Sequence, residues 1–123
     1  MRHSDTEQST NGQLRGVDTH AHLNMAPLKK DIHGAVARAG QAGLDFIGNV
    51  FLSPQQYRSD SPAFEHLSEV FFILGVHPHG ADAEDESSIA ELSEILQSDS
   101  RIRALGEIGL DFNRERSSRQ GQR

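Results

Sequence analysis

The chain has 123 residues, of which 35% are hydrophobic and 24% charged, and its formal net charge at pH 7 is −6. This length fits one domain, and the acidic balance argues against a broad basic surface for nucleic acid. The chain has no cysteine, which excludes disulfides, thiolate metal sites and a cysteine nucleophile. No apolar run reaches the roughly 18 residues of a membrane span and no apolar signal core is present, so we expect no membrane partner and a cytoplasmic location.

Polar residues are concentrated at the two ends of the chain. Residues 1–13 have no apolar periodicity, and we expect them to form a disordered N-terminal tail. Residues 113–123 are equally polar and carry four arginines, so we expect a basic tail that is poorly packed. The folded part is therefore expected at residues 14–112.

The first predicted strand covers residues 14–19 and ends at a pair of histidines. His20 and His22 leave an extended backbone two positions apart, so their imidazoles share one face. Two such imidazoles can bind one divalent cation, because histidine is the commonest protein ligand of metals. On spacing alone, two solvated surface side chains are the alternative.

Apolar residues at helical spacing predict a helix over residues 28–41, with Gly43 as its stop. Residues 46–52 form a short apolar run that predicts a buried strand. After this strand, Ser61 and Pro62 combine an N-cap with proline at the first helical position. They predict the start of a second helix, which would bury Val70 among its apolar residues.

Residues 71–76 form another apolar run, which predicts a third strand ending in a histidine-proline-histidine turn. A capping box from Ser88 to Glu91 then predicts a third helix. The run that begins at Ile102 predicts a fourth strand, whose exit covers residues 106–112. Long crossovers between four apolar strands predict a parallel sheet with right-handed connections.

In a parallel sheet, the residues that follow the strands all lie on one rim, which is where such folds place their function. Five candidates follow the first, third and fourth strands: His20, His22, His77, His79 and Glu107. Glu107 is the most informative, because a carboxylate in a buried strand costs several kcal/mol unless it is paired or metal-bound. His77 is either a substrate contact or an ordinary loop histidine.

Three segments of the chain resemble the N-terminal signatures of the TatD family of metal-dependent deoxyribonucleases, which are amidohydrolase-like barrels. They are residues 18–23 (DTHAHL), 75–79 (GVHPH) and 106–112 (GEIGLDF). The resemblance implies a (β/α)₈ barrel with two divalent ions, of magnesium, zinc or manganese. It assigns His20, His22 and Glu107 to the metals, Glu107 and His77 to catalysis, and His77 and His79 to the substrate phosphate.

A barrel of this kind typically needs about 250 residues. We therefore expect an α/β, TIM-barrel-like (β/α) fold truncated to about four parallel strands and three helices, the N-terminal half of the family's domain. The family's other ligands, two histidines and an aspartate, would come from later strands, so we expect at most one ion here. The open sheet edges of a half-barrel suggest a second chain as a cover.

Two functions stay open at this point. The first is a divalent-metal-dependent hydrolase that resembles TatD deoxyribonucleases, with DNA as its substrate and phosphodiester hydrolysis as its reaction. The second is a catalytically inactive, truncated fragment that binds a single metal ion or acts as an interaction module.

Overall fold

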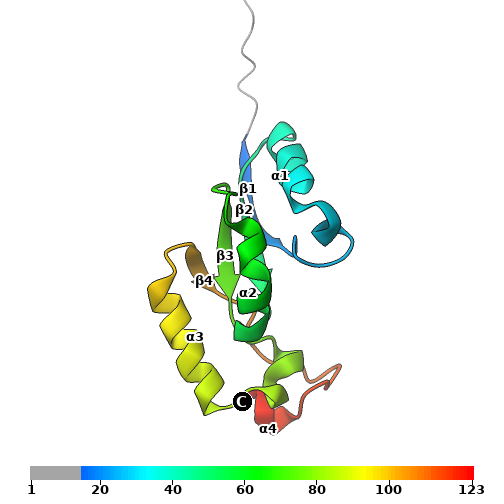
Figure 1. Cartoon of the computed structure of the whole chain (residues 1–123). Coiled ribbons are helices and arrows are strands. Elements are labelled where there is room, and N and C mark those ends of the chain that lie inside the picture. Colours follow the sequence, from blue (N-terminus) through cyan, green and yellow to red (C-terminus); the bar gives the residue numbers. More distant parts are fainter. Residues whose placement is uncertain (1–14) are drawn as a thin grey trace, which may run out of the picture.

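The computed structural model describes residues 15–123, so the predicted tail at residues 1–13 lies outside the described part. Its strands form one parallel sheet in the order β1 (Gly16–Ala21), β2 (Leu44–Phe51), β3 (Val70–Leu74) and β4 (Ile102–Leu105). Consecutive strands are linked through α1 (Ile32–Gln41), α2 (Pro54–Asp60) and α3 (Glu86–Ser98), and α4 (Arg119–Gln122) lies at the end of the chain (Figure 1). The predicted α/β fold with four parallel strands is confirmed.

The helix predicted over residues 28–41 is present, but its first turn is a 3₁₀ helix, η1 (Leu28–Asp31). The side chain of Asp31 then caps α1, because its carboxylate accepts the N–H of Gly34 at 3.0 Å. The predicted stop is confirmed at Gly43, whose φ of 106° is a conformation that favours glycine.

The second helix begins at Ser53 and Pro54, and not at Ser61 and Pro62 as the sequence predicted. Ser53 and Pro54 follow β2 after one residue, and Ser53 Oγ accepts the N–H of Gln56 at 3.1 Å, so this pair opens α2. The same serine-proline signal at Ser61 opens only a short 3₁₀ helix, η2 (Ser61–Phe64). Val70 is therefore the first residue of β3, where it is buried, and not part of a helix.

The third helix also begins earlier than predicted. Its N-cap is Asp85, whose carboxylate accepts the N–H and the hydroxyl of Ser88. Ser88 is therefore the third helical residue of the capping box and not its first. An aspartate and a serine accept this hydrogen bond almost equally well, so the two starts could not be separated by residue type.

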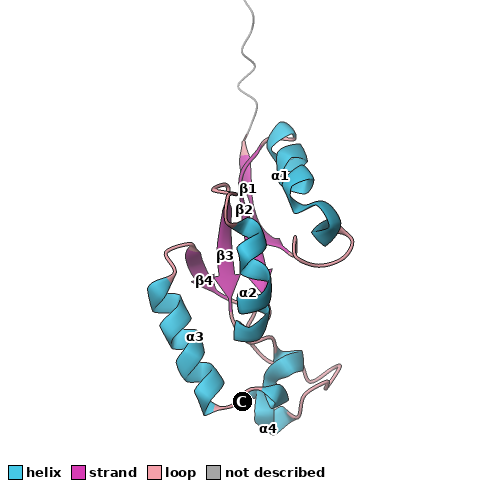
Figure 2. Ribbon diagram, viewed as in Figure 1, coloured by secondary structure: helices cyan, strands magenta, loops and turns pink. Residues whose placement is uncertain are grey.

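The core lies on the face of the sheet that α1, α2 and α3 cover (Figure 2). Phe51, Phe64 and Phe72 are fully buried there and pack edge to face, with ring centroids 5.0 to 6.0 Å apart. The guanidinium of Arg101 lies 4.2 Å from the centroid of Phe72. It also donates to three main-chain carbonyls at 2.8 to 2.9 Å, those of Phe64, Leu67 and Val70.

Tyr57 on α2 donates its hydroxyl to the carboxylate of Asp99, which precedes β4. Burial of the phenol, and then its contact with Asp99, raise the pKa of Tyr57 to about 12. This pKa exceeds the unfolded value of about 10, so the neutral phenol stabilises the folded chain. The stabilisation is complete below pH 10 and is lost as the pH rises towards 12.

We therefore expect the phenolate absorbance of Tyr57 to titrate with a midpoint near 12 in the folded chain. In urea the midpoint should fall to about 10. The signal is unambiguous, because the sequence has one tyrosine and no tryptophan. A midpoint of about 10 in both states would contradict the hydrogen bond between Tyr57 and Asp99.

Most residues of the predicted polar tail at 113–123 are exposed, but the segment is held to the rest of the fold by hydrogen bonds. Ser117 is 3% exposed, and α4 lies beside the 3₁₀ helix η3 (Pro78–Ala83) (Figure 1). Hydrogen bonds replace the missing apolar face here, which is why periodicity gave no sign of the contact. Among the helices of residues 15–123, none is long and apolar enough to cross a membrane.

Candidate metal centre

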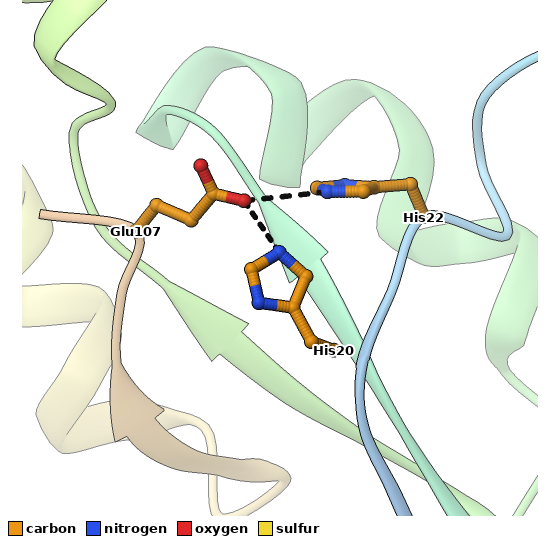
Figure 3. A group of neighbouring side chains, drawn as sticks. All are labelled: His20, His22 and Glu107. Atoms are coloured by element: carbon orange, nitrogen blue, oxygen red, sulfur yellow. Dashed lines mark hydrogen bonds and ion pairs between the residues drawn. The ribbon is translucent and has the colours of Figure 1, made fainter.

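The carboxylate of Glu107 lies among three imidazoles from two other strand ends. Its Oε1 is 2.6 Å from His20 Nε2 and 3.3 Å from His22 Nε2. Its Oε2 is 2.9 Å from the Nε2 atom of His77. Figure 3 shows His20 and His22 reaching from β1 towards the glutamate that follows β4. The structure thus brings together four of the five residues that the sequence predicted for this rim.

The end of β1 orients the first two histidines. Their rings approach edge to face with centroids 5.2 Å apart, as expected for residues two apart on an extended chain. The carboxylate of Asp18 accepts the N–H of His20 at 2.9 Å. His22 Nδ1 lies 3.2 Å from the carbonyl oxygen of Val50 on the neighbouring strand.

This last contact determines the tautomer of His22. A carbonyl oxygen only accepts, so Nδ1 must carry the hydrogen, and Nε2 of the neutral ring has a lone pair. That lone pair faces the Glu107 carboxylate, which is also only an acceptor when ionised. Two acceptors at this separation repel each other unless a cation or a proton lies between them.

A buried asparagine supports the loop that follows His22. Asn49 on β2 is fully buried, and its side-chain oxygen accepts the N–H of Leu23 at 2.7 Å. Its amide nitrogen donates to the side chain of Asn24 at 3.1 Å. Asn49 was not among the residues predicted from the sequence, although an asparagine inside an otherwise apolar run is a usable signal.

Glu107 does not lie within a strand, as the sequence suggested, but just beyond the end of β4, with a side chain 25% exposed. Its main chain passes very close to Gly75. A Cβ at Gly75 would lie 2.8 Å from the Glu107 carbonyl oxygen, so only glycine leaves the space. Gly109 is needed for another reason, since its φ of 124° disfavours other residues.

The two histidines of the third strand end take different places. His77 Nδ1 accepts the main-chain N–H of His79 at 3.1 Å, so Nε2 carries the hydrogen and donates to Glu107. His79 does not reach Glu107. Its Nε2 lies 2.5 Å from the carboxylate of Asp111, and this hydrogen bond, followed by those from the N–H groups of Arg114 and Asn113, holds the pKa of Asp111 below its usual value.

The donor set fits a divalent ion. Among residues 15–123, one group of possible ligands is found in which every ligand atom lies within 4.8 Å of the others: His20, His22 and Glu107. Two imidazoles and a carboxylate suit zinc or manganese, and they leave coordination positions for water. His77, which contacts Glu107, also helps His79 to line an open cavity of about 430 Å³.

Known proteins match most of the chain. Residues 17–123 match the family described as TatD related DNase. The metal-dependent hydrolase YjjV of Escherichia coli K12, which is described as uncharacterized, is 29% identical over 80% of this chain and 38% of its own length. The 3'-5' ssDNA/RNA exonuclease TatD of Edwardsiella piscicida is 34% identical over 83% of this chain and 39% of its own length.

The same relationship is seen in three dimensions. A crystal structure of YjjV, a TatD homologue from E. coli K12, matches with a TM-score of 0.76 and 27% identity, over 89% of this chain and 43% of that chain. The expectation of a TIM-barrel-like fold is confirmed by this likeness. The chain spans about two fifths of the length of the curated relatives it matches.

Proposed function

This chain belongs to the family of TatD-related DNases, and from that premise we propose that it is part of a divalent-metal-dependent hydrolase that cleaves phosphodiester bonds of nucleic acid. One observation carries the proposal: the lone pair of His22 Nε2 faces the carboxylate of Glu107 at 3.3 Å, an arrangement that calls for a cation. The names of the relatives, an ssDNA/RNA exonuclease and a metal-dependent hydrolase, support the same reading.

His20, His22 and Glu107 would hold the ion in this proposal. A divalent ion bound there would supply positive charge that makes a water more acidic and stabilises charge on a phosphate oxygen. Glu107 has a second task, because it contacts all three imidazoles and so sets their relative positions. His77 keeps Glu107 in place by donating to Oε2, which leaves Oε1 for the ion.

The substrate would lie in the cavity beside the ion. His77 and His79 line it together with Ser53, Gln55 and main chain at Gly80. Its volume of about 430 Å³ is in the range of small-ligand sites, and Leu52, Ala83 and Glu84 complete its lining. We propose that it takes a nucleotide next to the scissile bond, with His77 and His79 near the phosphate and single-stranded DNA as the substrate.

A second candidate is binding of one ion without turnover. It is favoured by the single group of three possible ligands among residues 15–123, because a second ion would have only the shared carboxylate of Glu107. One carboxylate does not hold a divalent ion well against water. A second chain that covers the open edges of the sheet belongs to this candidate as well.

A calorimetric titration with Mn²⁺ and a cleavage assay on single-stranded DNA separate these candidates. The double variant His20→Ala, His22→Ala removes two ligands, and His66→Ala serves as the control because His66 is exposed and lies outside the centre. The hydrolase is supported if the wild-type chain and His66→Ala cleave the DNA and the double variant does not. Binding of one ion without cleavage supports the second candidate, and wild-type chain that binds no ion contradicts both.

A further inference from the structure

Residues near the end of the chain are tied to the turn that carries His77 and His79. Ser117 Oγ donates to the carbonyl oxygen of His79 at 2.8 Å and accepts the N–H of Asp82 at 3.2 Å. The hydroxyl thus makes two hydrogen bonds to one turn, one as a donor and one as an acceptor. Ser117 is only 3% exposed. Losing the hydroxyl would leave the carbonyl of His79 and the N–H of Asp82 without this partner.

Gln122 on α4 completes the connection. Its side-chain oxygen accepts the N–H of Asp111 at 2.7 Å, and its amide nitrogen donates to the carbonyls of Asp111 and Ser117 at 3.2 and 2.9 Å. The carboxylate of Asp111 in turn lies 2.5 Å from Nε2 of the His79 ring. We call Ser117, Gln122 and Asp111 the clamp, since together they hold His79 by its carbonyl and by its ring.

The clamp reaches the metal centre through one hydrogen bond. The main-chain N–H of His79 donates to His77 Nδ1 at 3.1 Å, which places the hydrogen of the neutral His77 ring on Nε2. Only in that tautomer can His77 donate to Glu107 Oε2, 2.9 Å away. If the turn moved and the N–H left Nδ1, His77 could carry its hydrogen on either nitrogen.

We propose that Ser117 is a positioning residue of the metal centre: by holding the turn at His79, it keeps His77 in the tautomer that donates to Glu107. Ser117 is not among the ion's candidate ligands or the residues that line the cavity, so it acts on the centre through the turn that it holds at His79 and Asp82 and through His77. This inference rests on the metal centre proposed above. The effect of Ser117 on His77, however, can be measured in chain that holds no ion.

The test therefore reads the His77 tautomer and the ion affinity separately. Ring ¹⁵N shifts of His77 in ion-free chain at about pH 8 should show hydrogen on Nε2 in wild type and a mixture of both tautomers in Ser117→Ala. Affinity for Mn²⁺ should fall about fivefold in the same variant, the loss expected for one hydrogen bond. Ser117→Thr keeps the hydroxyl and should restore both readouts.

Ser98→Ala is the matched control, because the Ser98 hydroxyl also donates to a main-chain carbonyl but lies at the end of α3. If Ser117→Ala does not fold, Gln122→Met removes the neighbouring part of the clamp and should shift His77 in the same direction. A single Nε2–H tautomer in the folded variants, or a Ser117→Thr chain that behaves like Ser117→Ala, overturns the proposal. Wild-type chain that binds no Mn²⁺ overturns the metal centre instead, while the tautomer still decides the role of Ser117.

Discussion

Replacing Glu107 with glutamine should weaken the binding of Mn²⁺ by about 100-fold or more. Changes to groups that merely support a metal's ligands already reduce affinity by about 10- to 100-fold, and Glu107 supplies the anionic oxygen of the donor set itself. Glutamine keeps the shape of the side chain but loses its charge. Isothermal titration calorimetry of the two chains measures the difference directly.

The same substitution should leave the fold intact. The two N–H groups of a glutamine amide at this position can donate to His22 Nε2 and to His20 Nε2 in its Nδ1–H tautomer, the atoms that lie 3.3 and 2.6 Å from Glu107 Oε1 in the native chain. The repulsion between two acceptors is thereby removed, so the free energy of unfolding without ion should not decrease. Glu65→Gln makes the same change of charge at an exposed position and should leave the affinity unchanged. Equal affinity of wild type and Glu107→Gln would rule out the centre.

Replacing Arg101 with methionine should lower the free energy of unfolding by about 3 kcal/mol. The guanidinium donates to three carbonyls, two from the segment around η2 and one from β3, and it stacks on the buried ring of Phe72. Methionine keeps most of the apolar stem, so the loss reports the hydrogen bonds and the cation–π contact. Urea unfolding followed by circular dichroism gives the value.

Arg103→Met is the matched control for this prediction. Arg103 lies two residues further along, on β4, and is exposed, so its replacement should change stability by no more than about 0.5 kcal/mol. Equal effects of the two substitutions would contradict the prediction, because they would mean that water replaces Arg101 as the donor to the three carbonyls without loss of stability.

Local patterns in the sequence predicted the elements of the fold well. The apolar runs at residues 46–52 and 71–76 correspond to β2 and β3, and the stop at Gly43 is where α1 gives way to β2. Helix starts were predicted less well. Ser53 and Ser61 are each followed by proline, and the choice between them depended on how soon the chain could turn back onto the sheet after β2.

The candidate site, too, could be predicted only in part from the sequence. Parallel strands place the residues after β1, β3 and β4 on one rim, so His20, His77 and Glu107 could be expected together from the order of the elements alone. Which nitrogen of His22 or His77 carries the hydrogen could not be expected, because it depends on carbonyl and N–H groups that the fold supplies.

The parallel α/β order and the residue types at the rim could be predicted from the amino-acid sequence, because both follow from periodicity and spacing along one stretch of chain. The tautomers of His22 and His77, the support from Asn49 and the clamp at Ser117 could be described only from the folded chain. These rest on single hydrogen bonds between distant residues, such as Ser117 and His79, which are 38 positions apart. A polar residue in a polar segment has no periodic signature, so its partner is known only when the chain has folded.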